Sequence, residues 1–313
     1  MKKNKKFLLS LIILILAVCL FFISQIFYTK NKTNSLMMLI EFEEIDGILQ
    51  WEKELDQRGL TALVKVQDNV LEENKEVFRR LADKGYEIAG GYDEAPFWDM
   101  PYEEQYQHLK NSQELVEKIT GRRMRVFGSR YFAYDENTLK ASEDLGIEYI
   151  LARGTEGVEA IVYKPSEYNV KIISVTNVDV GEMGRGSLCD YSLWARGSGP
   201  EEFWQMIEES VAKKPKNMIL VSHSYLGGTR LLWWQKYLKA LNLPDLSWKS
   251  FDDWVLNQDI KYLDNKDIPI NREVKYVAPK PVKQIEEYEA IPGLEDLNKK
   301  IDSQSKDGEM LCQ

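Results

Sequence analysis

Residues 85–99 read GYEIAGGYDEAPFWD and lie between two segments, residues 72–84 and 102–119, that have the apolar spacing of helices. Gly85 stands where the cap of the preceding helix is expected, and residues 86–89 read as a short buried strand. A helix, a tight turn, a strand and a second helix in this order are typical of a βαβ-type chain. This stretch therefore decides the fold class, which is α/β.

Strands and helices continue to alternate along the chain. Strands are predicted at residues 36–42, 61–66, 86–89, 124–127, 148–151, 170–175 and 218–221, and helices at 48–57, 71–84, 102–119, 135–145 and 200–213. Such alternation indicates parallel βαβ units, in which functional side chains follow the C-terminal ends of the strands. Periodicity alone does not separate a barrel from an open doubly wound sheet. The tryptophan-rich residues 229–257 are expected to pack against this body.

Composition excludes one class of partner. The chain has 313 residues, 44% of them hydrophobic and 11% aromatic, which indicates a globular body with a substantial core. Residues 1–32 carry six lysines and no acidic residue, so the remaining chain carries a formal charge of −15, the total of −9 less these six positive charges. Such an acidic body, without a basic stripe, is not expected to bind nucleic acid.

Residues 7–28 form an uncharged run of 22 residues. About 20 apolar residues suffice to span a bilayer as a helix, and the four lysines before the run predict that the N-terminus stays in the cytoplasm. A cleaved signal peptide is the alternative, but its apolar core usually has about 7–15 residues and ends in an A-x-A-like site. Cys19, in LAVC, is only a faint lipoprotein signal. We therefore predict an uncleaved signal-anchor.

The other two cysteines, Cys189 and Cys312, are far apart and form no C-x-x-C spacing, so they are interpreted as two unpaired thiols. The predicted organisation is a basic cytoplasmic N-terminus at 1–6, the transmembrane anchor at 7–28, a linker at 29–35, one large domain at 36–265, and a polar, partly disordered tail at 266–313.

Residues 85–99, together with ITGRRMRVFGSRYFAYDENTLKASEDLGIEYIL at 119–151, resemble the polysaccharide deacetylase family (NodB homology, carbohydrate esterase family 4). The resemblance covers roughly residues 40–224. It implies a distorted (β/α)7 barrel over residues 36–265, which would follow the transmembrane helix predicted above. It also implies metal-dependent hydrolysis of C–N bonds in N-acetylated polysaccharides such as peptidoglycan, and hence a cell-envelope glycan as partner.

The metal-binding residues of the family are missing. Its first segment reads approximately GHEIGNHTxSH, and the last two histidines bind a divalent metal such as zinc. Here these places hold Gly91 and Ala95, and the whole chain has only two histidines, His108 and His223. An Asp-His-His triad with a further catalytic histidine cannot be assembled from two. The chain therefore reads as a degenerate member that holds no metal cofactor.

Acidic residues offer a weaker site. The family motif TFDD corresponds to EFEE at residues 41–44, so the resemblance gives Glu43 the place of the catalytic base and Glu44 that of a metal ligand. Glutamate is longer than aspartate by one methylene group, so each carboxylate is shifted by roughly an ångström from its place in the family. Such a shift matters where geometry must hold within about 0.5 Å. An oxygen-only site of Glu44, Asp93 and Asp99 would suit calcium, magnesium or manganese. Alternatively, Glu43 and Glu44 are solvated acids at a strand end, and the loop that contains Asp93 is an acidic surface loop.

Two further motifs survive in part. The family's RxPYG corresponds to GSRYF, in which Gly128 replaces the arginine that orients the base and Tyr131 remains. Arg130 either reaches the same carboxylate from another direction or pairs with a nearby acid. Asp190 and Trp194, in CDYSLW, echo an Asp-Trp pair whose tryptophan lines the groove. A tryptophan face stacks on sugar or packs in the core. Tyr131, Arg130 and Trp194 are the candidate substrate-binding residues.

The fifth motif is preserved best. ILVSHSYLGG, which begins at residue 219, resembles the family's strand followed by LxH, and it gives His223 the place of the general acid. A histidine at a strand end titrates near neutrality, although it also serves as a core hydrogen-bonding group. His108, in the helix at 102–119, reads as a surface residue.

The sequence thus predicts a single-pass membrane protein with an extracytoplasmic deacetylase-like domain, associated with cell-envelope carbohydrate and inactive or altered in its chemistry. Glu43 and His223 are the candidate catalytic residues, and Glu44 and Asp93 the weak candidates for a metal. The alternative is a non-catalytic glycan-binding or envelope interaction module. Metal content discriminates between the two.

Overall fold

One curved sheet organises the chain in the computed structural model, which describes residues 14–16, 18, 32–41, 45–98, 100–154, 157–270 and 281–294. In order across the sheet, its strands are β10 (Asn217–His223), β1 (Thr33–Glu41), β2 (Leu63–Gln67), β3 (Glu87–Tyr92), β4 (Val126–Ser129), β5 (Tyr149–Ala152), β7 (Lys171–Ser174), β6 (Ile161–Pro165) and β12 (Ile260–Leu263). A tenth strand, β11 (Leu246–Trp248), pairs with the beginning of β1.

The sheet is parallel except where β6 pairs with β7. Two short strands, β8 (Asn177–Asp179) and β9 (Arg185–Ser187), form a separate antiparallel pair. The segment around this pair spans the side of the curve between β7 and β10. There the Val221 amide donates to the Leu188 carbonyl, and the Leu188 amide to the Thr176 carbonyl. The arrangement is a curled sheet rather than a continuous ring of strands.

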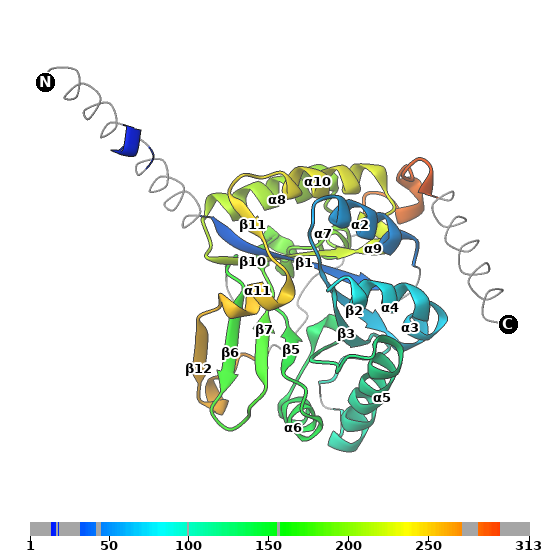
Figure 1. Cartoon of the computed structure of the whole chain (residues 1–313), viewed down its shortest axis with the longest axis vertical. Helices are drawn as coiled ribbons and strands as arrows, with labels where there is room; N and C mark the ends of the chain where they lie inside the picture. Colours follow the sequence, from blue (N-terminus) through cyan, green and yellow to red (C-terminus); the bar gives the residue numbers. More distant parts are fainter. Residues whose placement is uncertain are drawn as a thin grey trace, which may run out of the picture.

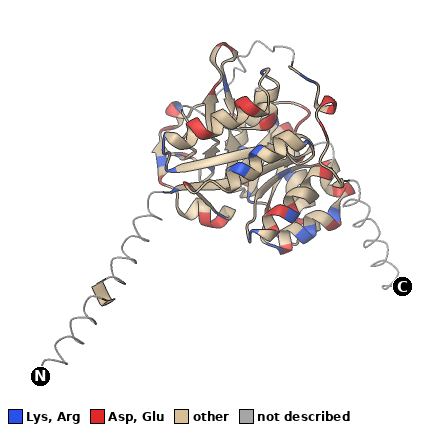
Figure 2. Cartoon of the chain, turned by 90° about the horizontal axis from the view of Figure 1, so that it is seen from above, with Lys and Arg blue, Asp and Glu red and all other residues tan. Residues whose placement is uncertain are grey.

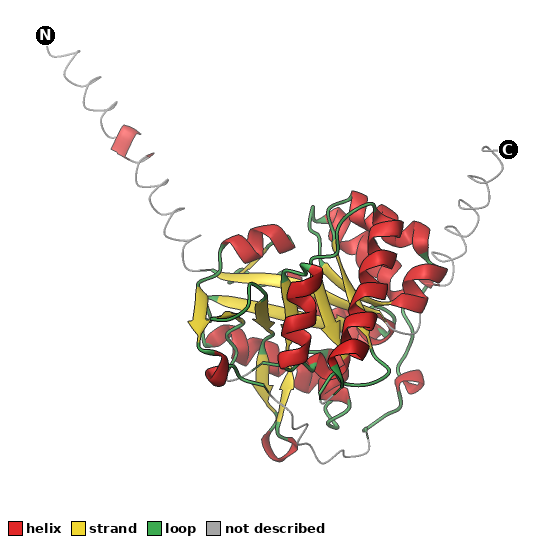
Figure 3. Ribbon diagram, turned by 90° about the horizontal axis from the view of Figure 1, so that it is seen from below, coloured by secondary structure: helices red, strands yellow, loops and turns green. Residues whose placement is uncertain are grey.

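Helices cover the outside of this curve (Figures 1 and 3). They are α2 (Asp46–Gln57), α3 (Asp68–Glu73), α4 (Lys75–Asp83), α5 (Tyr102–Thr120), α6 (Glu136–Leu145), α7 (Asp190–Trp194), α8 (Pro200–Ala212), α9 (Ser224–Gly227) and α10 (Leu231–Leu241). A further helix, α11 (Phe251–Leu256), packs against the inner side of the sheet. Lysine, arginine, aspartate and glutamate positions are spread along these helices (Figure 2).

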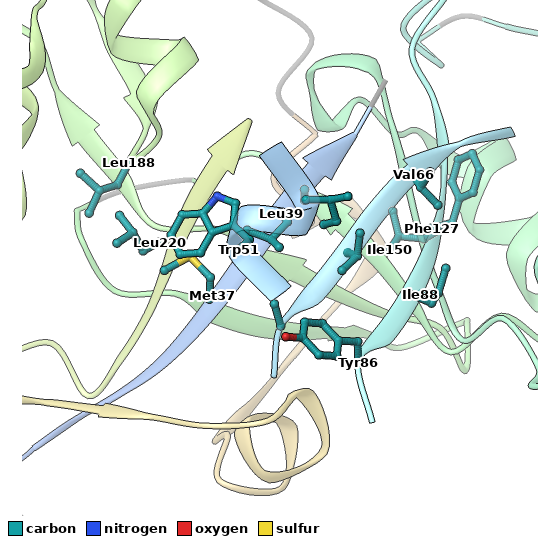
Figure 4. Packing of buried hydrophobic residues seen from close by; sticks show 14 of the residues in the cluster. Met37, Leu39, Trp51, Val66, Tyr86, Ile88, Phe127, Ile150, Leu188 and Leu220 are labelled. Atoms are coloured by element: carbon teal, nitrogen blue, oxygen red, sulfur yellow. The ribbon is translucent and has the colours of Figure 1, made fainter. Parts of the chain in front are cut away.

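Two buried clusters lie on the two faces of the sheet, because side chains of a strand alternate between its faces. On β1, Met37 and Leu39 pack with the outer helices, whereas Leu36, Met38 and Ile40 belong to the cluster inside the curve. Trp51 of α2 covers the outer face against Met37 and Leu220 (Figure 4). Its indole N–H donates to the Ser222 hydroxyl at 3.2 Å. Phe251 and Trp254 of α11 join the inner cluster.

The predicted α/β class and the predicted parallel strands are confirmed, but the count of seven in a barrel is wrong. The structure adds β6, β11 and β12 to the sheet, and β6 runs antiparallel to β7. These three strands have only three to five residues, and β12 reads IKYL with two exposed residues. Such short segments carry too little periodic signal to be predicted.

Two other differences have local causes. The single helix predicted at 71–84 is interrupted at Asn74, whose φ of −119° and ψ of 33° are not helical and whose side-chain amide donates to the Val70 carbonyl at 3.0 Å. The predicted tail is in part packed. Tyr288 is buried, and its ring centroid lies 5.9 Å from that of Trp233. The Leu231 amide, at the N-terminal end of α10, donates to the Glu289 carbonyl, so the segment that contains Tyr288 packs against the beginning of this helix.

The segment predicted to cross the membrane, residues 7–28, falls almost entirely outside the described residues. None of the helices that the structure does describe combines the length and the hydropathy needed to cross a bilayer. Residues 295–313, which contain the part of the tail predicted to be disordered, are likewise outside the described part.

Candidate functional site

A cavity of about 450 Å³ opens at the C-terminal ends of the central strands. Ile40 at the end of β1, Lys65 on β2, Asp93 after β3 and His223 at the end of β10 all line it. This is the edge at which parallel α/β sheets present functional side chains. A second hollow of about 400 Å³, around Arg125 at the opposite ends of the strands, contains none of the candidate residues.

His223 is held by the carboxylate of Asp190. The imidazole Nδ1 lies 3.2 Å from Asp190 Oδ1, and the backbone N–H of His223 donates to the same oxygen at 3.0 Å. Asp190 begins α7 and is fully buried, and it also accepts from the Ser222 hydroxyl at 3.1 Å. The aspartate therefore fixes the position and orientation of His223 at the cavity wall, as in an acid–base pair.

Cys189 completes a cluster with these two residues. Its Sγ lies 3.1 Å from His223 Nδ1 and 3.4 Å from Asp190 Oδ1. Burial, and in second place the charge of Asp190, raise the pKa of the Cys189 thiol well above its usual value, so it remains a neutral thiol. The three ligand atoms lie within 4.8 Å of one another, a set that could hold a metal ion. Hydrogen bonding accounts for the same distances, because Asp190 Oδ1 also accepts from the Tyr191 amide at 2.6 Å.

The floor of the cavity contains a buried lysine. Lys65 is only 2% exposed and lies on the inner face of β2, beside Ile40 of β1 and Ala89 of β3 in the register of the sheet. Its ammonium group forms an ion pair with the carboxylate of Asp93. A buried lysine needs such a partner, because an isolated charge away from water costs several kcal/mol.

Two glycines make room for this side chain. A Cβ added at Gly91 would lie 3.2 Å from Lys65 Cγ and 2.9 Å from the Val66 carbonyl oxygen. A Cβ added at Gly128 would lie 3.3 Å from Lys65 Cδ. Gly91 and Gly128 are the places where the resemblance expects a metal-binding histidine and the arginine of the third motif. The stem of Lys65 thus runs through space that larger side chains at these positions would need.

The described residues offer few ligands for a divalent metal at the place that the resemblance assigns to it. Gly91 and Ala95 carry no donor atom, and Glu44 and Asp99 lie outside the described residues. Asp93, proposed from the sequence as a candidate ligand, instead binds the Lys65 ammonium, so a positive charge already lies against this carboxylate. A second cation there would be repelled and would have to compete for the same oxygen atoms.

A strained turn forms one side of the cavity. Tyr131 and Phe132 have φ values of 58° and 53°, in the left-handed region that costs about 1–2 kcal/mol per residue for side chains other than glycine. The turn leaves Tyr131 44% exposed and beside the Arg130 guanidinium, whose carbon lies 5.1 Å from the centroid of the Tyr131 ring. Arg130 Nη1 donates to the Glu94 carbonyl at 2.9 Å. Strain of this kind persists where the surrounding structure holds it, and it clusters at functional sites.

The structure brings four of the sequence-selected residues together. Asp93, Arg130, Tyr131 and His223 all line the one cavity. Glu43, the candidate base, is outside the described residues. The catalytic and binding roles of these five residues remain predictions. His108 is half-buried, with its ring centroid 4.0 Å from that of Tyr92.

Trp194, the third candidate for sugar binding, is not among the residues that line the cavity. Its indole N–H donates to the Lys283 carbonyl at 2.9 Å, on the side where residues 281–294 pack. Tyr191, one helical turn earlier on α7, lines the cavity in its stead, with its ring centroid 4.9 Å from that of His223. The aromatic side chain beside His223 is therefore Tyr191.

Sequence reasoning missed Lys65 and the contact of Cys189 with His223. The signal for Lys65 was present, because a lysine interrupts the apolar strand TALVKV and shares the face of Leu63. No local pattern joins Cys189 to His223, since the two are brought together by the bridge of Cys189 to Val221 on β10.

Another buried carboxyl group lies behind the cavity. Glu41, at the end of β1, is fully buried, and neither side-chain oxygen has a hydrogen-bond partner among the residues described. Burial raises the pKa of Glu41 well above its usual value of 4.5; the Ser224 hydroxyl, in a contact short of hydrogen-bond geometry, opposes this rise, and the charge of Asp190 adds to it. Burial of Glu41 thus favours the neutral form of its carboxyl group.

Comparison with known proteins agrees with the fold. The family model described as polysaccharide deacetylase matches residues 50–150. No curated protein matches the chain. A structure from Mycobacterium smegmatis described as a polysaccharide deacetylase has a TM-score of 0.58 and 12% identity, over 74% of this chain and 94% of that one.

Two further solved structures are similar. A polysaccharide deacetylase from Pseudomonas aeruginosa PAO1 has a TM-score of 0.57 and 15% identity, over 72% of this chain and 91% of that one. A pseudoenzyme of carbohydrate esterase family 4 from Bacillus anthracis has a TM-score of 0.51 and 12% identity, over 75% of this chain and 70% of that one. At these identities the likeness shows the fold alone.

Replacing Glu41 by glutamine should change how stability depends on pH. Below about pH 4.5 the carboxyl group is protonated in the folded and the unfolded chain. At higher pH only the unfolded chain loses the proton, so stability falls by about 1.4 kcal/mol per pH unit until the folded pKa is reached. Glu41→Gln should lack this loss, so its melting temperature relative to the parent should rise from pH 5 to pH 8.

The matched control is Glu104→Gln, which changes an exposed carboxylate on α5. Thermal unfolding followed by circular dichroism at both pH values measures the effect. A constant difference between Glu41→Gln and the parent across this range would show that Glu41 is ionised in the folded protein.

Proposed function

Because residues 50–150 belong to the polysaccharide deacetylase family, we propose that this protein is a deacetylase-like module that binds N-acetylated glycan of the cell envelope and has lost the family's metal-dependent hydrolysis. The observation that carries the proposal is the course of Lys65. Its stem lies against Gly91 and Gly128, and its ammonium pairs with Asp93. A protein cation thus takes the region in which the family holds a metal ion.

The chemistry of the family depends on that metal, which polarises the acetamide carbonyl and activates water. Here Asp190 and His223 keep the geometry of an acid–base pair at the cavity wall. General acid–base catalysis contributes about 10²–10⁴-fold, too little by itself for amide hydrolysis. A protein from Bacillus anthracis with a similar fold is described as a pseudoenzyme. That protein is a precedent for the non-catalytic role that we propose for this chain.

The remaining lining of the cavity suits a carbohydrate. The aromatic rings of Tyr131 and Tyr191 and the polar groups of Ser129 and Ser192 surround it. Its volume of about 450 Å³ lies within the 300–1,000 Å³ range of ligand pockets. Aromatic faces pack against the C–H face of a sugar while polar groups hydrogen-bond its hydroxyls. Glycan binding therefore accounts for the retained cavity without requiring turnover.

We expect the purified protein to contain no stoichiometric zinc, cobalt or nickel, and to release no acetate from chitin oligomers or acetylated peptidoglycan fragments. Metal analysis by mass spectrometry and an acetate-release assay with and without chelator measure both. His223→Ala serves as the control for any residual turnover.

Stoichiometric metal, or turnover that both chelator and His223→Ala abolish, would contradict the inactive assignment. A metal that is lost in Cys189→Ser would place it on the cluster of Cys189, Asp190 and His223, and the protein would then be an enzyme with relocated ligands. Retention of metal in that variant would point to the acidic residues of the loops instead.

We further propose that the domain is held outside the cytoplasm by the uncharged segment at residues 7–28. The length of this segment and the lysines before it support the proposal. Expressed in a bacterial host, the protein should sediment with membranes, resist extraction by high salt and be accessible to protease from outside. A mature chain that begins between residues 20 and 35 and is released from membranes would contradict it.

A further inference from the structure

The Lys65 ammonium has more hydrogen-bond donors than its ion pair uses. An ammonium carries three N–H donors and no acceptor. Within the described part of the chain, Asp93 is the one residue that accepts a hydrogen bond from this ammonium. Lys65 is 2% exposed and lines the floor of the cavity. A buried ammonium is stabilised well only when its other N–H groups also find acceptors, so two donors are left for the contents of the cavity.

Asp93 also determines which groups these donors suit. Its carboxylate balances the charge of the Lys65 ammonium and leaves the remaining N–H groups polar. Such a pair is suited to an uncharged acceptor, above all a carbonyl oxygen. An amine that carries a proton would instead meet a like charge at short range, in a place where water screens the repulsion less than it does in bulk solution. The floor of the cavity therefore suits a carbonyl group and disfavours a ligand ammonium.

An apolar side chain lies directly beside the donors. In the register of the sheet, Ile40 of β1 is the neighbour of Lys65 on β2 and of His223 on β10. All three residues line the cavity, and so does the apolar ring of Phe132. A group that suits this arrangement combines a carbonyl oxygen with an apolar substituent. The acetamide group of an N-acetylated sugar does so, since its methyl group can contact Ile40 while its carbonyl oxygen accepts from Lys65.

We propose that Lys65 makes the cavity selective for the acetylated form of a glycan, because its ammonium donates to the acetamide carbonyl. The inference rests on the proposed glycan binding and names the group that is recognised. A glycan with free amino groups offers an ammonium where the carbonyl is needed. A glycan with hydroxyl groups at these positions lacks both the carbonyl and the methyl group. The protein thus distinguishes acetylated from deacetylated glycan.

Calorimetric titration of the purified full chain tests the inference with tetrasaccharides that share one backbone of β-linked glucose units. Chitotetraose carries acetamide groups, its fully deacetylated form carries amines, and cellotetraose carries hydroxyls at the same positions. Chitotetraose should bind about tenfold more tightly than either of the others, because a buried donor left without an acceptor is costly. Acetylated peptidoglycan fragments, and the same fragments after removal of their acetyl groups, form a second series with the same expected order.

Lys65→Met combined with Asp93→Asn, which leaves no charge unpaired, should bring the affinities for chitotetraose and cellotetraose within about twofold of each other. A purely structural role of Lys65 would lower both affinities together and keep their ratio. The matched control is Lys140→Met with Asp144→Asn, which removes a Lys–Asp ion pair from the surface of α6 and should keep the preference. If the cavity variant does not fold, a crystal structure of the parent with chitotetraose decides, and Lys65 Nζ should lie within about 3.2 Å of an acetamide oxygen.

Equal affinity for the acetylated glycans and their counterparts would overturn the inference and leave glycan binding intact. Tighter binding of the amino forms would also overturn it, because the Asp93 carboxylate would then be the group that holds the glycan. A preference that persists in the cavity variant, or a bound chitotetraose that does not contact Lys65, would assign the selectivity to other residues and overturn the role of Lys65. Binding of no glycan in either series would overturn the inference together with the proposed function.

Discussion

The ion pair between Lys65 and Asp93 decides what the rest of the site can do. Lys65 is almost completely buried on the inner face of β2, and Asp93 accompanies it at the end of β3. Removing one partner of a buried pair costs about 3–5 kcal/mol, because it leaves the other charge without compensation. The lysine stem also lies close to Gly91 and Gly128, where an added Cβ would come within 3.2 and 3.3 Å of it. A larger side chain at residue 91 would in addition meet the Val66 carbonyl, and one at residue 128 would meet Leu151.

The fold itself brings the other residues of the site together. Parallel strands bring their C-terminal ends to one edge, so His223, Asp93 and Arg130 meet there although they are distant in sequence. The pairing of His223 with Asp190 survives, and a cavity with aromatic and basic walls remains open above the lysine. In the function that we propose, the Lys65 ammonium takes the place of a metal, so the cavity binds its ligand without the metal that would activate water.

The sequence revealed the α/β alternation, the loop after β3 and the loss of the metal-binding histidines, because these depend on local patterns and on a count of residues. It did not reveal β6, β11 or β12, which have only three to five residues each. It also missed the meaning of Lys65, since one lysine in TALVKV is ordinary until the neighbouring strands show that it points inward between two glycines. The sequence also favoured Trp194 over Tyr191. Only the structure shows that the Trp194 indole donates to the Lys283 carbonyl, whereas Tyr191 lines the cavity.

The claim that a lysine has replaced the metal is tested most directly by a crystal structure grown with excess zinc, with diffraction data collected on both sides of the zinc absorption edge. The account predicts the Lys65 ammonium on the Asp93 carboxylate and no anomalous peak in the space between Gly91, Ala95 and Asp93. A peak there, with Asp93 as its ligand and Lys65 displaced, would contradict the account and restore a metal to the site.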